Sequence, residues 1–270
     1  MVLFTRAIVT GGSSGIGAGL VKVLLKAGVE VISLSRTETD FSAQEKAGNL
    51  WQISCDITNE EQLAAAFEKI SEKWDYCDLL FSNAGFGISG TVVATQKSQM
   101  IKQFDVNFFS AVSVIQSCLP LLRQAKDPRI VITSSVAGEI SIPYQAFYSA
   151  SKASLNMLAL ALNTELAADK IKTIAVMPGD CRTAFTDNRE KNSETWACYE
   201  KSEERSISKM EKDERSGYAA EYVAGQLFHY AGKRHPKALY GVGLSYRLLL
   251  AAYKIFPIRL TRWFVSKMYG

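Results

Sequence analysis

Short apolar runs rich in β-branched residues alternate along the chain with longer stretches in which apolar residues recur at helical spacing. The runs at 7–10, 29–34, 50–54, 79–82, 130–133 and 173–177 predict strands, and residues 17–27 and 60–73 predict amphipathic helices between them. The strand runs are almost continuously apolar, which is typical of strands covered on both faces. The pattern predicts an α/β fold with a Rossmann-like, doubly wound, mainly parallel seven-stranded sheet and helices on both faces, its last strand at 238–243.

Composition is that of a compact globular protein. Of the 270 residues, 47% are hydrophobic and 21% are charged, which excludes a disordered or fibrous chain. A parallel α/β core commonly uses about 250 residues, so we expect residues 1–270 to form a single domain. No apolar run reaches the roughly 18 residues of a membrane span, and the first apolar stretch is too short for a signal peptide.

Cysteine and histidine are too dispersed to indicate a metal site. The five cysteines lie far apart, without the close pairs of zinc sites or the density of a disulfide-rich domain. His229 and His235 are the only histidines, and neither lies near a cluster of cysteines or acids. We therefore expect no metal, no Ser-His-Asp triad and a cytoplasmic location.

Two segments depart from the pattern of the core. Nine acids and seven bases lie between residues 186 and 215 with few large apolar residues. Residues 186–216 therefore predict an exposed helical excursion, either a solvated charged surface or a lid over a substrate cleft. The tail, residues 245–270, is apolar with regularly placed cations, and Pro257 divides it into two short predicted helices.

Positive charge is concentrated in this tail. The formal net charge of the chain is +4, and the tail holds five cations and no acid, so the remainder carries −1. Such a tail suits a peripheral helix on anionic lipid or one that closes an apolar cleft, and packing on the body or across a dimer is the alternative. No recognised nucleic-acid reading module accompanies the basic residues, and we expect no nucleic-acid binding.

A glycine-rich loop follows the first predicted strand. Residues 10–17 read Thr-Gly-Gly-Ser-Ser-Gly-Ile-Gly and lead into the first helical pattern. Glycine lets the backbone approach a pyrophosphate, and the free N–H groups at the start of the helix favour negative charge. A glycine-rich loop by itself forms only a turn, but its place between a strand and a helix favours a phosphate cradle.

The spacing Gly11, Gly15, Gly17 resembles the Thr-Gly-x-x-x-Gly-x-Gly signature of the short-chain dehydrogenase/reductase family. Matching motifs follow in the family's order over roughly the first 185 residues. They are Asp56-Ile57, Asn83-Ala84-Gly85, Asp105-Val106-Asn107, Ser134-Ser135, Tyr148-Ser149-Ala150-Ser151-Lys152 and Pro178-Gly179 with Thr183. The resemblance implies an oxidoreductase that interconverts a carbonyl and an alcohol.

Tyrosine with lysine four residues later suits acid/base chemistry. Both side chains lie on one helix face, and the charge of Lys152 favours the tyrosinate form of Tyr148, lowering a pKa that is ordinarily near 10. The resemblance adds that Lys152 binds the nicotinamide ribose, that Ser135 hydrogen-bonds the substrate oxygen, and that Asn107 holds a water in a proton relay. Taken singly, these residues have ordinary structural explanations; together, in family order, they predict a catalytic set.

The cofactor is expected to be NADP(H) rather than NAD(H). An acid at the end of the second strand favours NAD, whereas Ser35 stands there and Arg36 follows, a cation that accommodates a 2′-phosphate. An exposed loop charge is the alternative explanation of Arg36. The expected cofactor-binding residues are Gly11, Ser13, Ser14, Gly15, Ile16, Gly17, Arg36, Asp56, Ile57, Asn83, Ala84, Gly85, Tyr148, Lys152, Pro178, Gly179 and Thr183.

The sequence thus predicts an NADP(H)-dependent oxidoreductase whose apolar tail indicates a lipid-, steroid- or retinoid-like carbonyl or alcohol. Its rivals are a non-catalytic NADP(H)-sensing protein on the same fold and a membrane-peripheral binding protein that uses the tail. The resemblance further implies a homodimer or homotetramer formed through the helices that contain Asn107 and Tyr148.

Overall fold

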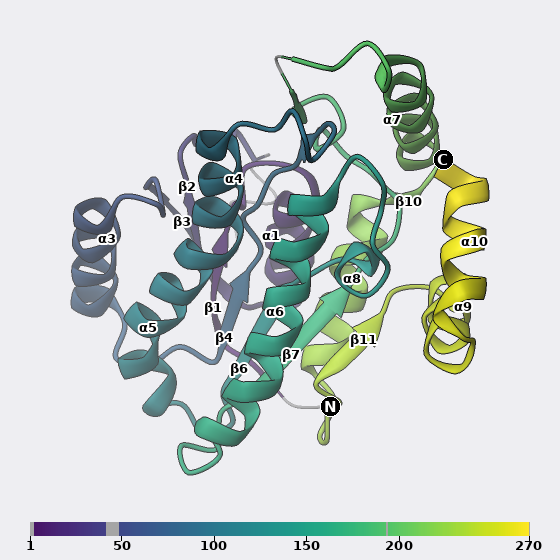
Figure 1. The fold of residues 1–270 in the computed structure, drawn as a ribbon. Helices are drawn as coiled ribbons and strands as arrows, with labels where there is room; N and C mark the ends of the chain where they lie inside the picture. Colours follow the sequence, from purple (N-terminus) through teal and green to yellow (C-terminus); the bar gives the residue numbers. More distant parts are fainter. Residues whose placement is uncertain (1–2, 42–48, 193, 270) are drawn as a thin grey trace.

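Seven strands of the computed structural model form one parallel sheet in the middle of the molecule (Figure 1). The structure describes residues 3–41, 49–192 and 194–269. The strands are β1 (Arg6–Thr10), β2 (Glu30–Ser35), β3 (Leu50–Ser54), β4 (Leu79–Ser82), β6 (Arg129–Thr133), β7 (Lys172–Met177) and β11 (Leu239–Gly241). Their order is β11-β7-β6-β4-β1-β2-β3, and every neighbouring pair is parallel. The predicted doubly wound sheet is confirmed, with a shorter last strand than expected.

Helices cover both faces of the sheet. Over one face, α1 (Gly15–Lys26) and α8 (Ala220–Ala231) pack on each other, and their apolar side chains join the core below β1 and β2. The other face is covered by α3 (Glu60–Lys73), α5 (Ser110–Arg123) and α6 (Ala146–Glu165). Helix α3 has its predicted bounds, whereas α1 begins before residue 17 because Ser14, in extended conformation, is its N-cap.

The site lies where the order of the strands reverses. Strand β1 has β2 on one side and β4 on the other, so the chain leaves these central strands in opposite directions and a crevice opens at their carboxyl ends. The register pairs Thr10 with Leu34 and Thr133 with Val176. The glycine loop and the segments that follow β4, β6 and β7 therefore meet at one edge of the sheet.

One helical stretch is long and apolar enough to cross a membrane by length and composition. It comprises α4 (Lys97–Phe104), the π-helical segment η1 (Asp105–Phe109) and α5. Polar side chains interrupt the stretch, and α5 packs against α3 and β4 with Val114, Ile115 and Leu122 in the core. Because these side chains are buried by the sheet, the stretch is a core helix of the α/β fold.

The segments predicted as lid and tail lie on the same side of the molecule (Figure 1). Within the former, α7 (Glu200–Arg215) contacts α10 (Ile258–Tyr269). Helix α9 (Leu244–Ile255) follows β11, and Pro257 lies between α9 and α10. Two short parallel pairs tie the excursion to the body: β5 (Ile88–Ser89) with β9 (Glu190–Lys191), and β8 (Cys181–Arg182) with β10 (Tyr218–Ala219).

Candidate active site

The glycine loop packs so closely that side chains are excluded from it. Gly11 and Gly15 have φ angles of +68° and +53°, which favour glycine. A Cβ on Gly17 would lie 2.0 Å from the carbonyl oxygen of Gly11, and a Cβ on Gly11 would lie 3.1 Å from Cα of Ala84. The backbone at the start of α1 stays accessible, with free N–H groups and the positive end of the helix dipole. This cradle fits the pyrophosphate of a dinucleotide.

Hydrogen bonds hold the turn after β4 against this loop. Thr10 Oγ1 accepts from the backbone N–H groups of Asn83 at 2.9 Å and Ala84 at 3.1 Å. The side chain of Asn83 donates to the carbonyl of Thr10 at 3.1 Å and accepts from Thr133 Oγ1 at 3.0 Å. Asn83 therefore links the ends of β1, β4 and β6, which places Ala84 and Gly85 in the wall of a cavity.

The ends of β2 and β3 form the other side of this wall. Ser35 is the last residue of β2, and the exposed Arg36 follows it. After β3, Asp56 Oδ1 accepts from the backbone N–H of Thr58 at 3.0 Å and from its hydroxyl at 2.8 Å. These bonds fix the carboxylate of Asp56 beside Ile57, and both residues line the cavity with Arg36.

Asn107 lies fully buried in the π-helical segment η1. Its Oδ1 accepts from the backbone N–H of Phe86 at 3.0 Å, and its Nδ2 donates to the carbonyl of Phe86 and to Ser151 Oγ, each at 3.0 Å. A Cβ on Gly85 would lie 3.2 Å from Asn107 Oδ1 and 3.4 Å from Lys152 Nζ. The wider π-helical turn thus places Asn107 near Lys152, and a Cβ on Gly85 would be in tight contact with both side chains.

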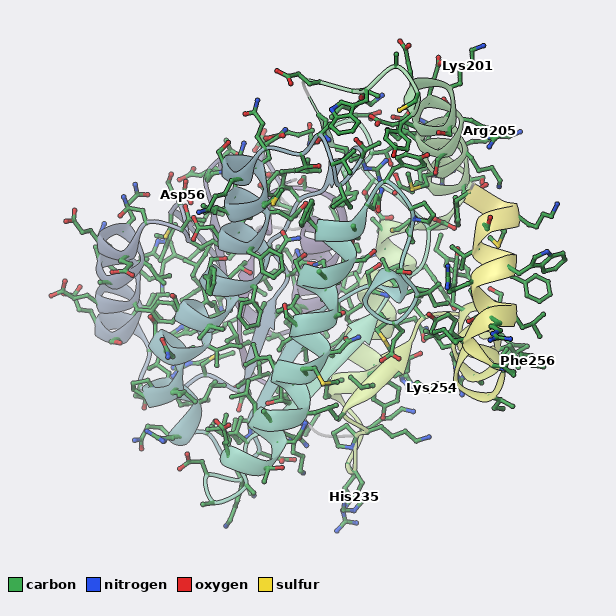
Figure 2. The ribbon with its side chains drawn as sticks, in the orientation of Figure 1. Asp56, Lys201, Arg205, His235, Lys254 and Phe256 are labelled. Atoms are coloured by element: carbon green, nitrogen blue, oxygen red, sulfur yellow. The ribbon has the colours of Figure 1, made fainter. Side chains whose placement is uncertain are left out.

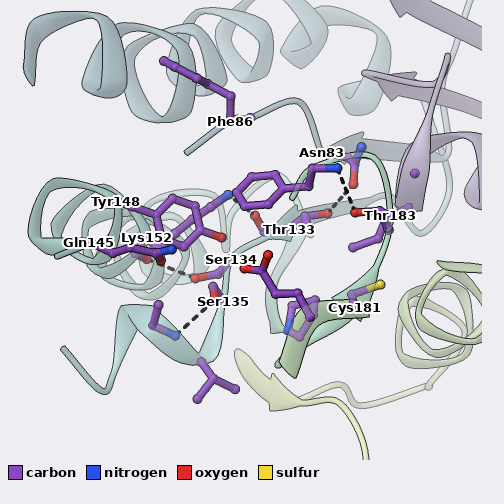
Figure 3. A pocket seen from close by; sticks show the side chains of 18 of the residues that line it. Asn83, Phe86, Thr133, Ser134, Ser135, Gln145, Tyr148, Lys152, Cys181 and Thr183 are labelled. Carbon is purple, nitrogen blue, oxygen red and sulfur yellow. Dashed lines mark hydrogen bonds between the residues drawn. The ribbon is translucent and has the colours of Figure 1, made fainter. Parts of the chain in front are cut away.

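Tyr148 and Lys152 lie one turn apart on α6. Lys152 Nζ is 5.8 Å from the centre of the Tyr148 ring and donates to the carbonyl of Thr133 at 2.9 Å. Ser135, which follows β6, hydrogen-bonds with Tyr148 and accepts from the backbone N–H of Ala137 at 3.1 Å. Figure 3 shows Ser135, Tyr148 and Lys152 gathered on one side of the pocket.

Burial controls the ionisation of this pair. It raises the pKa of Tyr148 to about 12, against a smaller lowering by the hydrogen bond with Ser135. It also lowers the pKa of Lys152 to about 8. The expected lowering of the Tyr148 pKa by the lysine charge is not found: desolvation disfavours both charged forms, and the groups that lower the tyrosine pKa are Ser135 and Arg189. Tyr148 is protonated at neutral pH, as a proton donor must be.

A cavity of about 1490 Å³ extends from the glycine loop to the tail helices. Gly17 and Asn107 lie behind its wall, and the other predicted site residues line it. They are Gly11, Ser13, Ser14, Gly15, Ile16, Arg36, Asp56, Ile57, Asn83, Ala84, Gly85, Ser135, Tyr148, Lys152, Pro178, Gly179 and Thr183. Cys181 also lines the cavity, and burial raises the pKa of its thiol to about 12, so it is protonated at neutral pH.

Comparison with known proteins decides the family. The model of the short chain dehydrogenase family matches residues 5–194. The probable short-chain type dehydrogenase/reductase VdlC of Helicobacter pylori is 35% identical to this chain over 266 residues, 96% of this chain and 95% of the relative. The chain belongs to the short-chain dehydrogenase/reductase family.

Other members of this family match along nearly the whole chain. A 3-ketodihydrosphingosine reductase of Bacteroides thetaiotaomicron is 32% identical over 249 residues, 92% of this chain and 91% of the relative. A short chain dehydrogenase/reductase of Burkholderia phymatum, solved in complex with NAD, superposes with a TM-score of 0.82 at 24% identity over 94% of each chain. This chain is accordingly a short-chain oxidoreductase of the family that uses NAD(P)(H).

The tail of this short-chain dehydrogenase/reductase contributes Tyr246 to the site, a residue that the sequence did not indicate. Tyr246, on α9, donates to Asp180 Oδ2 at 2.5 Å and accepts from the backbone N–H of Asp180 at 3.0 Å. A Cβ on Gly179 would lie 2.1 Å from Tyr246 Cζ, so the ring packs directly on the Pro178-Gly179 turn. The sequence marks the turn by its motif, but nothing marks a partner 66 residues away.

A buried ion pair on the lid side was also missed. Glu214, near the end of α7, lines the cavity, accepts from Thr186 Oγ1 at 2.6 Å and forms an ion pair with Arg189. The guanidinium of Arg189 lies 5.6 Å from the centre of the Phe185 ring, which is itself 5.6 Å from that of Tyr148. The charged segment 186–216 therefore reaches Phe185 beside Tyr148, whereas its composition left a solvated surface and a lid as alternatives.

Proposed function

We propose that this protein is an NADP(H)-dependent reductase that interconverts a carbonyl with a primary or secondary alcohol on an apolar, lipid-, steroid- or retinoid-like substrate. The observation that carries the proposal is one cavity with two different ends. Ser135, Tyr148 and Lys152 lie between the glycine loop at one end and the apolar side chains of α9 and α10 at the other. A dinucleotide fits the first end, and an apolar substrate fits the second.

When bound, NADP(H) would supply the hydride for reduction and accept it in oxidation. Tyr148, protonated at neutral pH, donates its phenolic proton to the substrate oxygen as the carbonyl is reduced. The hydroxyl of Ser135 orients that oxygen. Lys152 would hold the ribose hydroxyls and, with Asn107, return a proton to Tyr148. Thr183 would hold the nicotinamide amide.

The preference for NADP(H) rests on the carboxyl end of β2. Ser35 is there in place of an acid, so no carboxylate repels a 2′-phosphate, and Arg36 lines the cavity beside it. Hydroxyl groups supply further donors: Thr37 Oγ1 lies 3.5 Å from Ser13 Oγ, and both residues line the same part of the cavity. A guanidinium flanked by hydroxyls is suited to bind a phosphate.

The apolar substrate class rests on the wall that the tail builds. The side chains of Leu249, Phe256, Phe264, Val265 and Met268 line the cavity beyond the catalytic residues. At about 1490 Å³ the cavity is larger than the 300–1,000 Å³ of ordinary ligand pockets, as a site for a dinucleotide together with a long substrate requires. The name of the Bacteroides thetaiotaomicron relative, 3-ketodihydrosphingosine reductase, also specifies a ketone.

Loss of NADPH absorbance with a series of ketones and aldehydes, from small polar to long-chain and steroidal, tests this function. Tyr148→Phe should reduce kcat at least about 100-fold, because a positioned acid contributes about 10²–10⁴-fold. Tyr76→Phe is the matched control, since Tyr76 hydrogen-bonds with Thr5 far from the cavity. Turnover that rises with apolar chain length supports the substrate class. NADPH binding without turnover of any carbonyl would support a sensing role instead.

We also propose a cytoplasmic homo-oligomer that uses the helices predicted for this role. Large apolar side chains are exposed on α4 to α6: Ile101 and Phe109 by 57% and 55%, and Met157 and Leu160 by 61% and 39%. The helices α4, η1 and α6 contact one another, so these residues belong to neighbouring surfaces. Met157→Glu should shift the mass measured by light scattering toward the monomer. A monomeric wild-type protein would contradict this assembly.

A further inference from the structure

The mouth of the cavity is rimmed by apolar side chains. Leu249, Phe256, Phe264 and Met268 line the cavity, and they are nevertheless 41%, 51%, 51% and 49% exposed. Figure 2 shows Phe256 at the outer edge of the molecule, away from the sheet. Contiguous exposed apolar side chains on a folded protein mark an interaction site, so this rim indicates an apolar environment at the entrance.

The rim continues onto the outward surface of both tail helices. Leu248 and Ile255 on α9 are 62% and 79% exposed, and Ile258 and Trp263 on α10 are 64% and 53% exposed. None of these four side chains lines the cavity. Each tail helix therefore has one apolar face toward the site and further apolar residues toward the outside. We call the rim together with these outward residues the tail surface.

Cations surround the tail surface, and among the described residues most of them have no acidic partner. Residues 245–270 contain five cations and no acid. Within the described residues, the structure has no ion pair of Arg259, Arg262 or Lys267, and Lys254 lies 3.6 Å from Glu139. A surface that combines exposed Trp, Phe and Leu with unpaired cations is complementary to an anionic lipid surface.

A small groove extends the positive charge from α10 to α7. Its volume is about 260 Å³, and it is lined by Arg205, Ser206, Lys209 and Lys267. Lys209 also pairs with Asp213. The buried hydroxyl of Ser206 has no hydrogen-bond partner among the described residues. Three cations and an unpartnered hydroxyl at the edge of an apolar surface suit the phosphate of a lipid headgroup.

We propose that the tail surface docks this protein on an anionic lipid bilayer, with the mouth of the cavity facing the membrane. A second copy of the chain is the less suitable occupant. A two-fold contact would place the same unpaired cations of the two copies close together, and the tail has no acid to compensate them. The docking goes beyond the proposed function and is measured without any turnover.

Cosedimentation with vesicles tests the docking. The full chain should bind vesicles of phosphatidylcholine with phosphatidylglycerol, and bind vesicles of phosphatidylcholine alone far more weakly. The double variant Arg259→Gln with Arg262→Gln should reduce the anionic partition coefficient by about 30-fold, since each cation near the surface contributes about fivefold. The matched control is Lys26→Gln with Lys69→Gln, two exposed lysines on α1 and α3, which should leave the partition nearly unchanged.

Two tryptophans with nearly equal exposure locate the contact. Trp263 on α10 is 53% exposed, and Trp196, which precedes α7, is 55% exposed. If the tail surface enters the lipid, anionic vesicles should shift the fluorescence emission to shorter wavelength. The shift should be lost in Trp263→Phe and retained in Trp196→Phe.

Three results would overturn the docking: equal binding to both vesicle types, equal effects of the arginine and lysine variants, or an emission shift carried by Trp196. Leu248→Glu with Ile255→Glu separates the lipid from a second copy, because neither residue lines the cavity. Loss of vesicle binding with an unchanged mass in light scattering supports the lipid. A fall in mass would show that the surface joins two copies instead.

Discussion

The buried ammonium of Lys152 makes this protein less stable at neutral pH than it would be with an uncharged side chain at this position. Only 4% of the residue is exposed, and Nζ donates a hydrogen bond to the carbonyl of Thr133 at 2.9 Å. Burial lowers the lysine pKa from 10.5 to about 8. Because one pKa unit corresponds to about 1.4 kcal/mol, keeping Lys152 protonated costs about 3 kcal/mol in the folded protein.

The pH dependence of this cost has a defined sign. The pKa of Lys152 is lower in the folded than in the unfolded chain, so between about pH 8 and the ordinary lysine value of 10.5 the unfolded chain holds the extra proton. The free energy of unfolding therefore rises by about 1.4 kcal/mol per pH unit in that range. Tyr148 acts in the opposite direction only above about pH 10, where the unfolded tyrosine ionises and the buried one, with a pKa of about 12, does not.

Lys152→Met should accordingly stabilise the cofactor-free protein at neutral pH while removing activity. The gain is about 3 kcal/mol from the lost charge, less about 1 kcal/mol for the unpaired carbonyl of Thr133. The cost of the unpaired carbonyl does not change with pH, whereas the cost of the buried charge falls as Lys152 loses its proton. The difference in the free energy of unfolding between variant and wild type should therefore shrink by nearly 3 kcal/mol between about pH 7 and about pH 10. Urea unfolding of both proteins at the two pH values measures this, with Lys69→Met as the control for loss of an exposed lysine. A difference that is the same at both pH values would refute the reasoning.

Four further outcomes are expected. Arg36→Ala should lower kcat/KM for NADPH about ten- to a hundredfold relative to NADH, through loss of a charged hydrogen bond; an unchanged ratio would count against the cofactor preference. Gly17→Ala should prevent NADPH binding in calorimetry, because its Cβ would overlap a carbonyl oxygen at 2.0 Å, whereas Gly225→Ala, with open space in α8, should bind normally. Tyr246→Phe should lower the free energy of unfolding by about 1–3 kcal/mol, since it leaves the half-buried carboxylate of Asp180 and its backbone N–H without this partner. The rate of alcohol oxidation should increase about tenfold per pH unit from pH 7 to 9, because the required Tyr148 phenolate, with a pKa of about 12, becomes more populated as pH rises, while reduction should not gain.

The fold was predictable because its signals are local. The central strands are buried on both faces and are therefore mostly apolar, as in β1 and β4. In the segments between them, apolar residues recur at helical spacing. The start of α3 coincides with prediction because Asn59 caps it by accepting from the backbone N–H of Gln62. The sequence does not predict the π-helical turn at Asn107, because these residues also suit an ordinary helix and the wider turn depends on packing.

The positions of the candidate site residues also followed from the sequence. Glycines that exclude a Cβ, and a tyrosine and lysine one helical turn apart, are short motifs at the carboxyl ends of strands or on one helix. A parallel sheet brings those ends to one edge whatever the loops contain. The sequence by itself therefore determined the sheet, the glycine loop after its first strand and the spacing of Tyr148 and Lys152.

Tertiary structure alone decided the ionisation of that pair and the far wall of the cavity. The spacing predicts that the lysine charge lowers the tyrosine pKa, but the folded protein buries both groups, and desolvation shifts the pKa of each toward its neutral form. Tyr246 meets Asp180, and Glu214 meets Arg189, across separations that no local pattern encodes. Burial and long-range contact depend on how distant segments pack together, and a linear pattern of polar and apolar residues does not specify that packing.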